Sequence, residues 1–221
     1  MLFRSMLQVI LGNLYMSKSE TNFTARQLML DSAYDAAQRS AEIVRQLMVT
    51  VRPQSNQVAE PIDVASSIRH IVDFAYRTFD RRIEITLAIA DDLPPLEIDG
   101  DQFEQVVLNL LINARDAVAE LEDRSPHITI EASKRPDSED GSPSNCICIR
   151  ITDNGIGMDE ATIQRVFEPF FTTKSIDVAA GLGLSMVDSI IQQRGGTVEV
   201  KSQLGKGSTF SIFLPTVLLS V

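Results

Sequence analysis

Residues 105–118 carry the pattern that most constrains the fold of this chain. Seven aliphatic side chains recur there at helical spacing and define one buried face: Val106, Val107, Leu110, Leu111, Ala114, Ala117 and Val118. Asn109, Asn113 and Asp116 are four and three residues apart, so they share a second face. The stretch therefore predicts a helix that packs on a core with one side and presents amides on the other.

The amide-bearing face needs polar partners, because a buried amide without hydrogen bonds costs about 1–3 kcal/mol. A Mg²⁺ ion surrounded by phosphate oxygens would supply them, since this cation takes oxygen ligands and keeps few protein contacts. From these residues alone, a capping pair or a solvated face is the alternative.

Charge and hydropathy exclude two kinds of partner. The formal net charge of −10 argues against a nucleic-acid surface, which needs clustered Lys and Arg. No apolar run approaches the roughly 20 residues that cross a bilayer.

Cys146 and Cys148 lie one residue apart in a β-branched run and are expected to be small core residues of a reduced, cytoplasmic protein. A longer parent protein could still be tethered to a membrane.

The first 52 residues are predicted to form a helical hairpin. Leu7 to about Ser17 and Ala25 to about Arg52 have helical patterns, joined by a short polar link at 19–22. One antiparallel hairpin buries a single seam, so two copies are expected to pair as a homodimeric four-helix bundle. Residues 53–60, which begin at Pro53, are the expected linker.

Residues 61–221 are predicted to form a second domain of the α+β class. Helices are expected at 62–79 after a cap at Asp63, from about 99 through the amide-bearing stretch, at 160–166 and at 184–193. Strands are expected at 82–89, 128–133, 147–152, 197–202 and 208–214, with a hairpin loop at 136–144. Helices on one side of a mixed, largely antiparallel sheet would make a two-layer sandwich.

Two glycine motifs carry candidate binding residues. Asp153 ends an apolar strand just before Gly155 and Gly157, where a carboxylate could accept a hydrogen bond from the exocyclic amine of adenine and glycines would let a flat ring approach. A capping role before the next helix is the alternative for Asp153. The second motif, Gly181-Leu182-Gly183-Leu184, opens a helix whose amide hydrogens suit a triphosphate.

The segment between these motifs has the composition of a mobile lid. Residues 172–180 hold few large apolar side chains and no clear periodicity. Phe167, Phe170 and Phe171 precede it and are interpreted as its apolar hinge rather than as a base-stacking platform.

Five motifs together resemble the catalytic domain of sensor histidine kinases, in the GHKL ATPase superfamily. In chain order they are Asn109-Leu-Leu-Ile-Asn113-Ala, Asp153-Asn-Gly-Ile-Gly157, Phe167-Glu-Pro-Phe-Phe-Thr-Thr-Lys174, Gly181-Leu-Gly-Leu184 and Gly205-Lys-Gly207. The resemblance covers about residues 61–216, and Leu7 to Leu14 is similar to the segment that follows the family's phosphoacceptor box.

The resemblance implies a Bergerat fold that binds ATP as its Mg²⁺ complex. Asn113, helped by Asn109, would hold the metal, and Asp153 would bind adenine. Gly155, Gly157 and the second glycine motif would shape the pocket and lid, with Lys174, Arg115 or Asp116 lining it. The family's reaction moves the γ-phosphoryl group to a histidine on a helical hairpin, and then to an aspartate of a response regulator.

The chain departs from the family pattern at two places. No histidine stands before Leu7, where the acceptor is expected: residues 2–5 read like a translated adapter, so either the acceptor was lost by truncation or the chain is a degenerate kinase. His70 and His127 are expected to be surface residues. Val178-Ala-Ala180 replaces the Gly and Thr expected before the second glycine motif, which bears on the geometry of the lid.

Two other functions stay open beside that of a histidine kinase lacking its own acceptor. One is a non-catalytic ATP-binding dimerisation module, and the other is a hydrolytic GHKL ATPase. Hydrolytic relatives carry Glu at the position of Asn109 to activate water. An amide cannot accept a proton at neutral pH, so the sequence favours the kinase.

Overall fold

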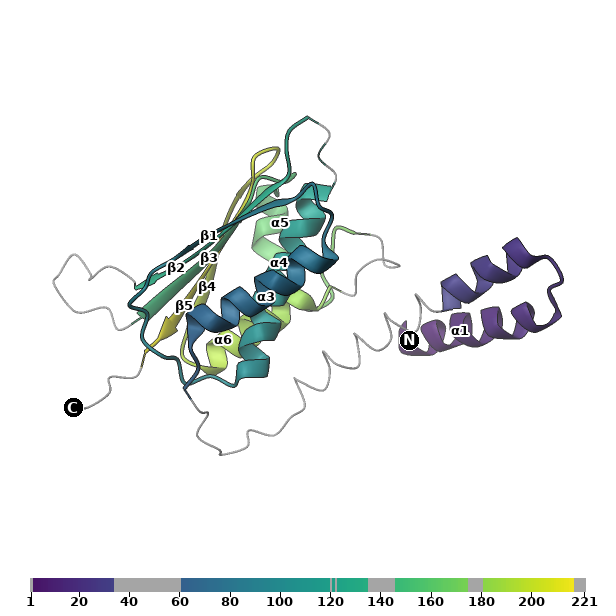
Figure 1. Ribbon diagram of the computed structural model, residues 1–221, viewed down its shortest axis with the longest axis horizontal. Coiled ribbons are helices and arrows are strands. Elements are labelled where there is room, and N and C mark those ends of the chain that lie inside the picture. Colours follow the sequence, from purple (N-terminus) through teal and green to yellow (C-terminus); the bar gives the residue numbers. More distant parts are fainter. Residues whose placement is uncertain are drawn as a thin grey trace. The chain divides into compact units, whose positions relative to one another are not determined.

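The computed structural model describes residues 2–33, 61–119, 121, 123–134, 146–174 and 181–216. The chain divides into two compact units, Met1–Ser55 and Asn56–Val221 (Figure 1). No helix among the described residues is long and apolar enough to cross a membrane.

The first unit contains a helical hairpin. Helix α1 spans Leu2–Ser19, and a second helical segment covers residues 23–33. The amide of Asn13 donates to the hydroxyl of Ser32 at 3.0 Å, which ties the two segments in antiparallel order. Helix α1 begins five residues earlier than predicted, because residues 2–6 contain no Gly or Pro to end it. The predicted continuation to Arg52 and the 53–60 linker lie outside the described residues.

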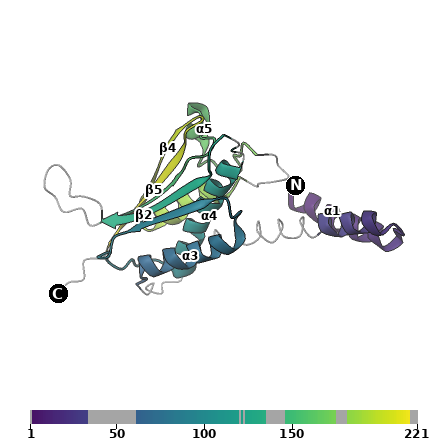
Figure 2. The same cartoon turned by 45° about the horizontal axis from the view of Figure 1, so that its top comes forward.

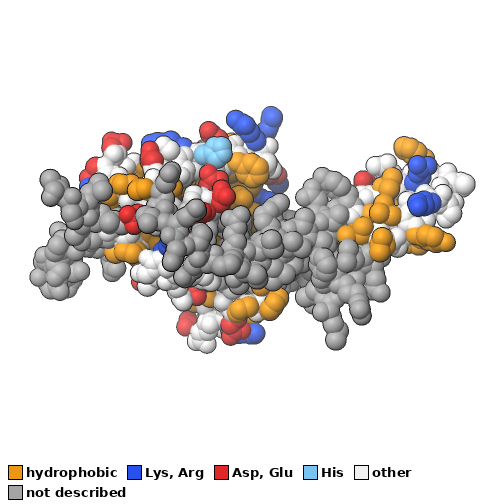
Figure 3. All heavy atoms as spheres, turned by 90° about the horizontal axis from the view of Figure 1, so that it is seen from below, with side chains coloured by type: hydrophobic (Ala, Val, Ile, Leu, Met, Phe, Trp, Pro, Cys, Tyr) orange, Lys and Arg blue, Asp and Glu red, His pale blue; other side chains and the backbone are white. Residues whose placement is uncertain are grey.

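The hairpin exposes many apolar side chains. Figure 3 shows hydrophobic side chains gathered along it, and those more than a third exposed are Val9, Leu11, Leu14, Tyr15, Met16, Phe23 and Leu28. Surface patches of this kind mark interaction sites in soluble proteins.

The second unit is built on a mixed sheet of five strands. They are β1 (Glu84–Ile89), β2 (His127–Lys134), β3 (Cys146–Asp153), β4 (Thr197–Gln203) and β5 (Gly207–Pro215), in the order β1-β2-β3-β5-β4. Strands β1 and β2 are parallel, and every other neighbouring pair is antiparallel.

Among the described residues, the helices that accompany this sheet are α3 (Val64–Thr78), α4 (Gly100–Ala119), α5 (Glu160–Arg165) and α6 (Gly183–Gln193). The long helices α3, α4 and α6 lie on one side of it, as Figures 1 and 2 show. Asp63 caps α3 by accepting from the backbone N–H groups of Ala65 and Ser66, as predicted. The predicted two-layer α+β architecture is confirmed.

The core lies between the helical layer and the sheet. Alternating strand residues reach it from one face, and aliphatic and aromatic side chains meet them from the helices. Fully buried members include Ile128, Ile130, Ile149, Ile151, Ile212, Phe103, Val107, Leu111, Val187 and Ile191. Cys148 is buried and Cys146 is half-buried, both on the face of β3 opposite Ile149 and Ile151, and neither forms a disulfide.

Candidate functional site

Helix α4 is the centre of the candidate site, and Asn109 fixes it to the next motif. Asn109 is only 5% exposed, and both polar atoms of its side chain have partners within the protein. Its Oδ1 accepts from the amide of Gln105 at 3.1 Å, and its Nδ2 approaches the carbonyl oxygen of Gly183 at 3.4 Å and the sulfur of Met186 at 3.8 Å. Protein atoms therefore satisfy this amide and join α4 to the beginning of α6.

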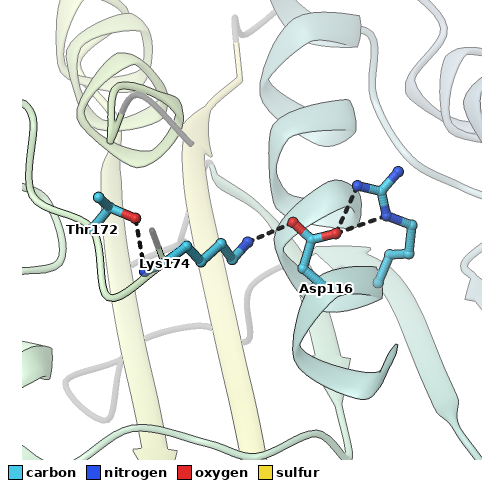
Figure 4. Close-up of polar contacts among 4 residues, drawn as sticks. Asp116, Thr172 and Lys174 are labelled. Atoms are coloured by element: carbon cyan, nitrogen blue, oxygen red, sulfur yellow. Dashed lines mark hydrogen bonds and ion pairs between the residues drawn. The ribbon is translucent and has the colours of Figure 1, made fainter. Parts of the chain in front are cut away.

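Asp116 lies half-buried one turn beyond Asn113, and its two carboxylate oxygens bind two different cations. Oδ1 accepts from Nε and Nη2 of Arg115 at 2.8 and 2.6 Å. Oδ2 accepts from Nζ of Lys174 at 2.5 Å, across 58 residues of sequence (Figure 4). Both oxygens thus have charge-assisted partners within the chain. Asn113 is half-buried on the same helix.

Two further contacts fix this cluster from its ends. The guanidinium of Arg115 stands over the ring of Phe79, 5.2 Å from its centre. The backbone N–H of Lys174 donates to the hydroxyl of Thr172 at 3.1 Å, as Figure 4 also shows.

Asp153 ends β3 inside the protein. It is 5% exposed, and its Oδ1 accepts from the backbone N–H groups of Gly155 at 2.8 Å and Ser208 at 3.2 Å. Burial raises the pKa of this carboxyl, against the opposing effect of these two hydrogen bonds. The nearby helix α5 is capped by Asp159 instead, so the capping alternative for Asp153 is excluded.

The glycines after Asp153 serve close packing. A Cβ on Gly155 would stand 2.5 Å from the backbone of Ala117 on α4, and one on Gly157, whose φ is +66°, would stand 2.0 Å from the carbonyl oxygen of Gln203. The N–H of Ile156 also donates to the carbonyl of Ala117 at 3.1 Å. The glycines were expected to make room for a flat ring, whereas protein backbone takes up the space where their side chains would be.

Arg124 holds the turn after β3, a role that the sequence did not reveal. Its Nε and Nη2 donate to the carbonyl oxygens of Asn154 and Gly155, both at 2.9 Å. The arginine thereby clamps the turn after β3. It lies in a polar stretch after α4 with no periodicity or motif, so only the folded structure brings it to this turn.

Residues on either side of the predicted lid are hydrogen-bonded to each other. The N–H of Phe170 donates to the carbonyl oxygen of Gly181 at 2.8 Å, and both residues have φ near +66°. A Cβ on Gly181 would stand 2.6 Å from the backbone of Phe170, so glycine is required there. Residues 175–180, including the Val178-Ala-Ala180 departure, lie outside the described residues.

The phenylalanines before the lid divide into two groups. The ring of Phe167 packs edge-on against buried Phe210 at 6.5 Å, and the ring of Phe171 carries the guanidinium of Arg165 at 4.4 Å. These two fit the predicted hinge, whereas Phe170 is 63% exposed. A cavity of about 400 Å³ beside them is lined by Arg165, Glu168, Pro169, Phe170, Phe171, Thr172 and Lys174.

Helix α6 begins at Gly183 without a side-chain cap on its N-terminus. Uncapped amide hydrogens at such a position attract anions. Leu182 precedes the helix, and Gly183 and Leu184 form its first turn. The second glycine motif therefore places the N-terminus of α6, which has no side-chain cap, next to Asn109 of α4.

Neither histidine lies in the cluster of Arg115, Asp116 and Lys174. His70 is exposed on α3, and His127 pairs with Glu84 at 3.5 Å and with the hydroxyl of Thr129 at 3.1 Å. No group of three or more His, Cys, Asp or Glu side chains able to hold a metal occurs among the described residues. A cation at this site would depend on amide oxygens and on the oxygens of a ligand.

Residues 98–218 match the family model described as histidine kinase-, DNA gyrase B- and HSP90-like ATPase. The chain belongs to this family. The match spans the five motifs and most of the second unit, so an ATP-binding domain of the predicted kind is confirmed.

Sensor kinases are among its most similar curated relatives. Sensor kinase CckA of Brucella abortus is 37% identical over 187 residues, which are 82% of this chain and 20% of that protein. Sensor histidine kinase ZraS of Escherichia coli K12 is 34% identical over 180 residues, 81% of this chain and 36% of that protein. The chain thus spans about a fifth to a third of the lengths of these relatives.

Solved structures support the same fold. Histidine kinase ThkA in complex with the response regulator TrrA aligns with a TM-score of 0.73 at 19% identity, over 97% of this chain and 59% of that one. Full-length ShkA in complex with AMPPNP aligns with a TM-score of 0.70 at 22% identity, over 99% of this chain and 45% of that one. At these identities the likeness is one of architecture.

Proposed function

We propose that the second unit binds Mg²⁺-ATP and transfers its γ-phosphoryl group to a histidine, as the ATP-binding catalytic core of a sensor histidine kinase. The convergence of distant motifs on one helix carries this proposal. The turn after Asp153 packs on Ala117, the start of α6 contacts Asn109, and Lys174 pairs with Asp116. The family match and the named sensor kinase relatives support the same reading.

The adenine is assigned to Asp153. Backbone N–H groups hold the carboxylate in one orientation, and its burial strengthens any hydrogen bond that it accepts from an exocyclic amine. Gly155 and Gly157 set the turn that brings this carboxylate to α4, while Arg124 keeps the turn closed.

The triphosphate is assigned to the space between α4, Lys174 and the first turn of α6. Gly181, Leu182, Gly183 and Leu184 bring the uncapped helix N-terminus there, and Lys174 adds a positive charge. Both features are chemically suited to phosphate oxygens, in a chain whose overall charge is −10.

The donor set on α4 fits Mg²⁺. Asn113 is the principal ligand, and Asn109 is a second one if its oxygen exchanges Gln105 for the cation. The bound cation would neutralise phosphate charge as the γ-phosphoryl group leaves. Asp116 is not assigned to the metal, because its two oxygens already bind Arg115 and Lys174.

In the proposed transfer, a histidine nitrogen forms a bond to the γ-phosphorus while the bond to the β,γ-bridging oxygen breaks and ADP leaves. The chain's role is positioning and charge neutralisation rather than covalent chemistry. His70 is exposed on α3, and His127 pairs with Glu84 and Thr129 rather than with residues of α4, so the acceptor is assigned to a helical hairpin of another polypeptide segment.

The exposed apolar stripe of the helical hairpin supports a homodimer built through it. By analogy with ThkA, which has been crystallised with its response regulator TrrA, a receiver domain is the proposed next acceptor. Use of ATP assigns the reaction to the cytoplasm. A hydrolytic ATPase is disfavoured, because the amide of Asn109 is tied to α6 and cannot take a proton from water.

The proposal is tested by incubating the protein with γ-labelled ATP and a homologous hairpin that carries the acceptor histidine. Acid-labile label on the hairpin is the expected result, and Asn113→Ala should abolish it. Nucleotide binding without transfer would favour the non-catalytic module instead. Rapid release of phosphate with no acceptor present would favour the ATPase.

A further inference from the structure

Asp116 joins two cationic side chains from different parts of the fold. Arg115 is its neighbour on α4, whereas Lys174 is the last residue of the motif that begins at Phe167; Figure 4 shows Lys174 opposite Asp116. The side chains of Arg115, Asp116 and Lys174 are 38%, 25% and 31% exposed, so water partly reaches the cluster. A ligand that enters beside α4 can therefore contact Lys174.

Arg115 is held in place by Asp116 and Phe79. Its guanidinium makes two hydrogen bonds to Oδ1 of Asp116 and stands over Phe79, a ring that is 8% exposed. Stacking and a bidentate contact hold an arginine in one orientation. Asp116 is consequently fixed, with Oδ2 directed at Lys174.

In the part of the chain that the structure describes, the ammonium of Lys174 donates to Asp116 alone. This ammonium carries three N–H bonds, and one of them is donated to Asp116. A lysine without such a partner samples many rotamers, and binding a ligand would have to restrict them. The three side chains carry a net charge of +1, which leaves the cluster attractive to phosphate.

We propose that Asp116 is a positioning residue that holds the ammonium of Lys174 toward the phosphates of the nucleotide and does not itself contact nucleotide or metal. The inference rests on the proposed nucleotide site and adds the residue through which Lys174 acts. In the opposite arrangement, Asp116 would compete with the phosphates for Lys174. Removing the carboxylate of Asp116 would then strengthen ATP binding.

Titrations with Mg²⁺-ATP and with adenosine measure the coupling between the two residues. Wild type, Asp116→Asn, Lys174→Met and the double variant form the cycle. Loss of a charge-assisted hydrogen bond predicts a roughly tenfold weaker affinity for ATP in Lys174→Met. Asp116→Asn should weaken ATP binding to a similar extent, and the double variant should bind no worse than either single one. Adenosine affinity should stay within about twofold in all four proteins.

The matched control is the pair Lys134–Asp92, which has the same 2.5 Å separation outside the site. Asp92→Asn should leave ATP affinity unchanged. Asp116→Ala repeats the test without an amide, and thermal melting confirms folding of each variant.

Three results would overturn the inference alone: tighter ATP binding by Asp116→Asn, full additivity in the double variant, or an equal loss of adenosine affinity. A wild-type protein that bound neither adenosine nor ATP would contradict the proposed function itself, and the inference with it.

Discussion

Asp153 is a buried carboxylate whose proposed role is to accept a hydrogen bond from the adenine amine. Replacing it with Asn keeps the size of the side chain but removes the fixed carboxylate that would accept the adenine amine. The expected result for Asp153→Asn is a loss of ATP affinity of about tenfold or more, measured by titration calorimetry. Unchanged affinity would contradict its assignment to adenine.

The raised pKa of Asp153 also predicts a dependence of stability on pH. Burial makes ionisation harder in the folded state, so the folded protein binds more protons than the unfolded chain between the two pKa values. The free energy of unfolding of wild type relative to Asp153→Asn should therefore fall as pH rises from about 3.8, the ordinary value, through the folded pKa. Urea denaturation at a series of pH values measures it.

Asp159 provides a control of opposite sign. Its hydrogen bonds to Thr162 lower its pKa, so its contribution to stability is present above the ordinary value and is lost as pH falls. Wild type relative to Asp159→Asn should accordingly gain stability as pH rises toward about 3.8, below the pH range in which wild type relative to Asp153→Asn loses it.

Gly155 is predicted to tolerate no side chain. Gly155→Ala would place a Cβ 2.5 Å from the backbone of Ala117, and overpacking of this kind typically costs about 1–3 kcal/mol. Gly100→Ala, whose nearest neighbour would be Ile62 at 3.9 Å, should change the unfolding free energy by less than about 0.5 kcal/mol. Equal effects in chemical denaturation would contradict the close approach of the turn to α4.

Arg124 joins the segment after α4 to the turn after β3 through two hydrogen bonds. Arg124→Met removes two hydrogen bonds from the turn after β3, so backbone amides 154–157 should exchange hydrogen faster. ATP affinity should fall roughly threefold to tenfold as the turn loses its preorganisation. Arg150→Met, which removes an exposed contact to Glu131, should leave both measurements unchanged. Unaltered exchange in Arg124→Met would contradict the clamp.

Most elements of the second unit could be predicted, because periodicity and capping are local signals. Each described helix and strand there begins and ends within two residues of its predicted range. The order of the strands and the partners of Asn109 and Asp116 could not, since they depend on contacts between distant segments. For that reason, no local signal in the sequence indicated the roles of Gln105, Met186 and Arg124. Glycine motifs predicted where the chain turns tightly, but not that Ala117 and Gln203 fill the space beside them.

The two units of the chain are predicted to act separately. A fragment of residues 56–221 should fold and bind ATP with the affinity of the full chain, because the described site residues all lie within this unit. Sedimentation should show a dimer for the full chain and a monomer for the fragment. Leu11→Lys, at an exposed apolar position of the hairpin, should weaken the dimer. A monomeric full chain at high concentration would contradict a dimer formed through the hairpin.

The proposed function requires that α4 and the glycine motifs bind ATP through Mg²⁺. Calorimetric titration of wild type and Asn113→Ala with ATP, with and without Mg²⁺, measures this. The proposed function predicts binding by wild type that Mg²⁺ strengthens, and loss of that strengthening in Asn113→Ala. Absence of ATP binding, or a variant whose affinity still responds fully to Mg²⁺, would contradict it.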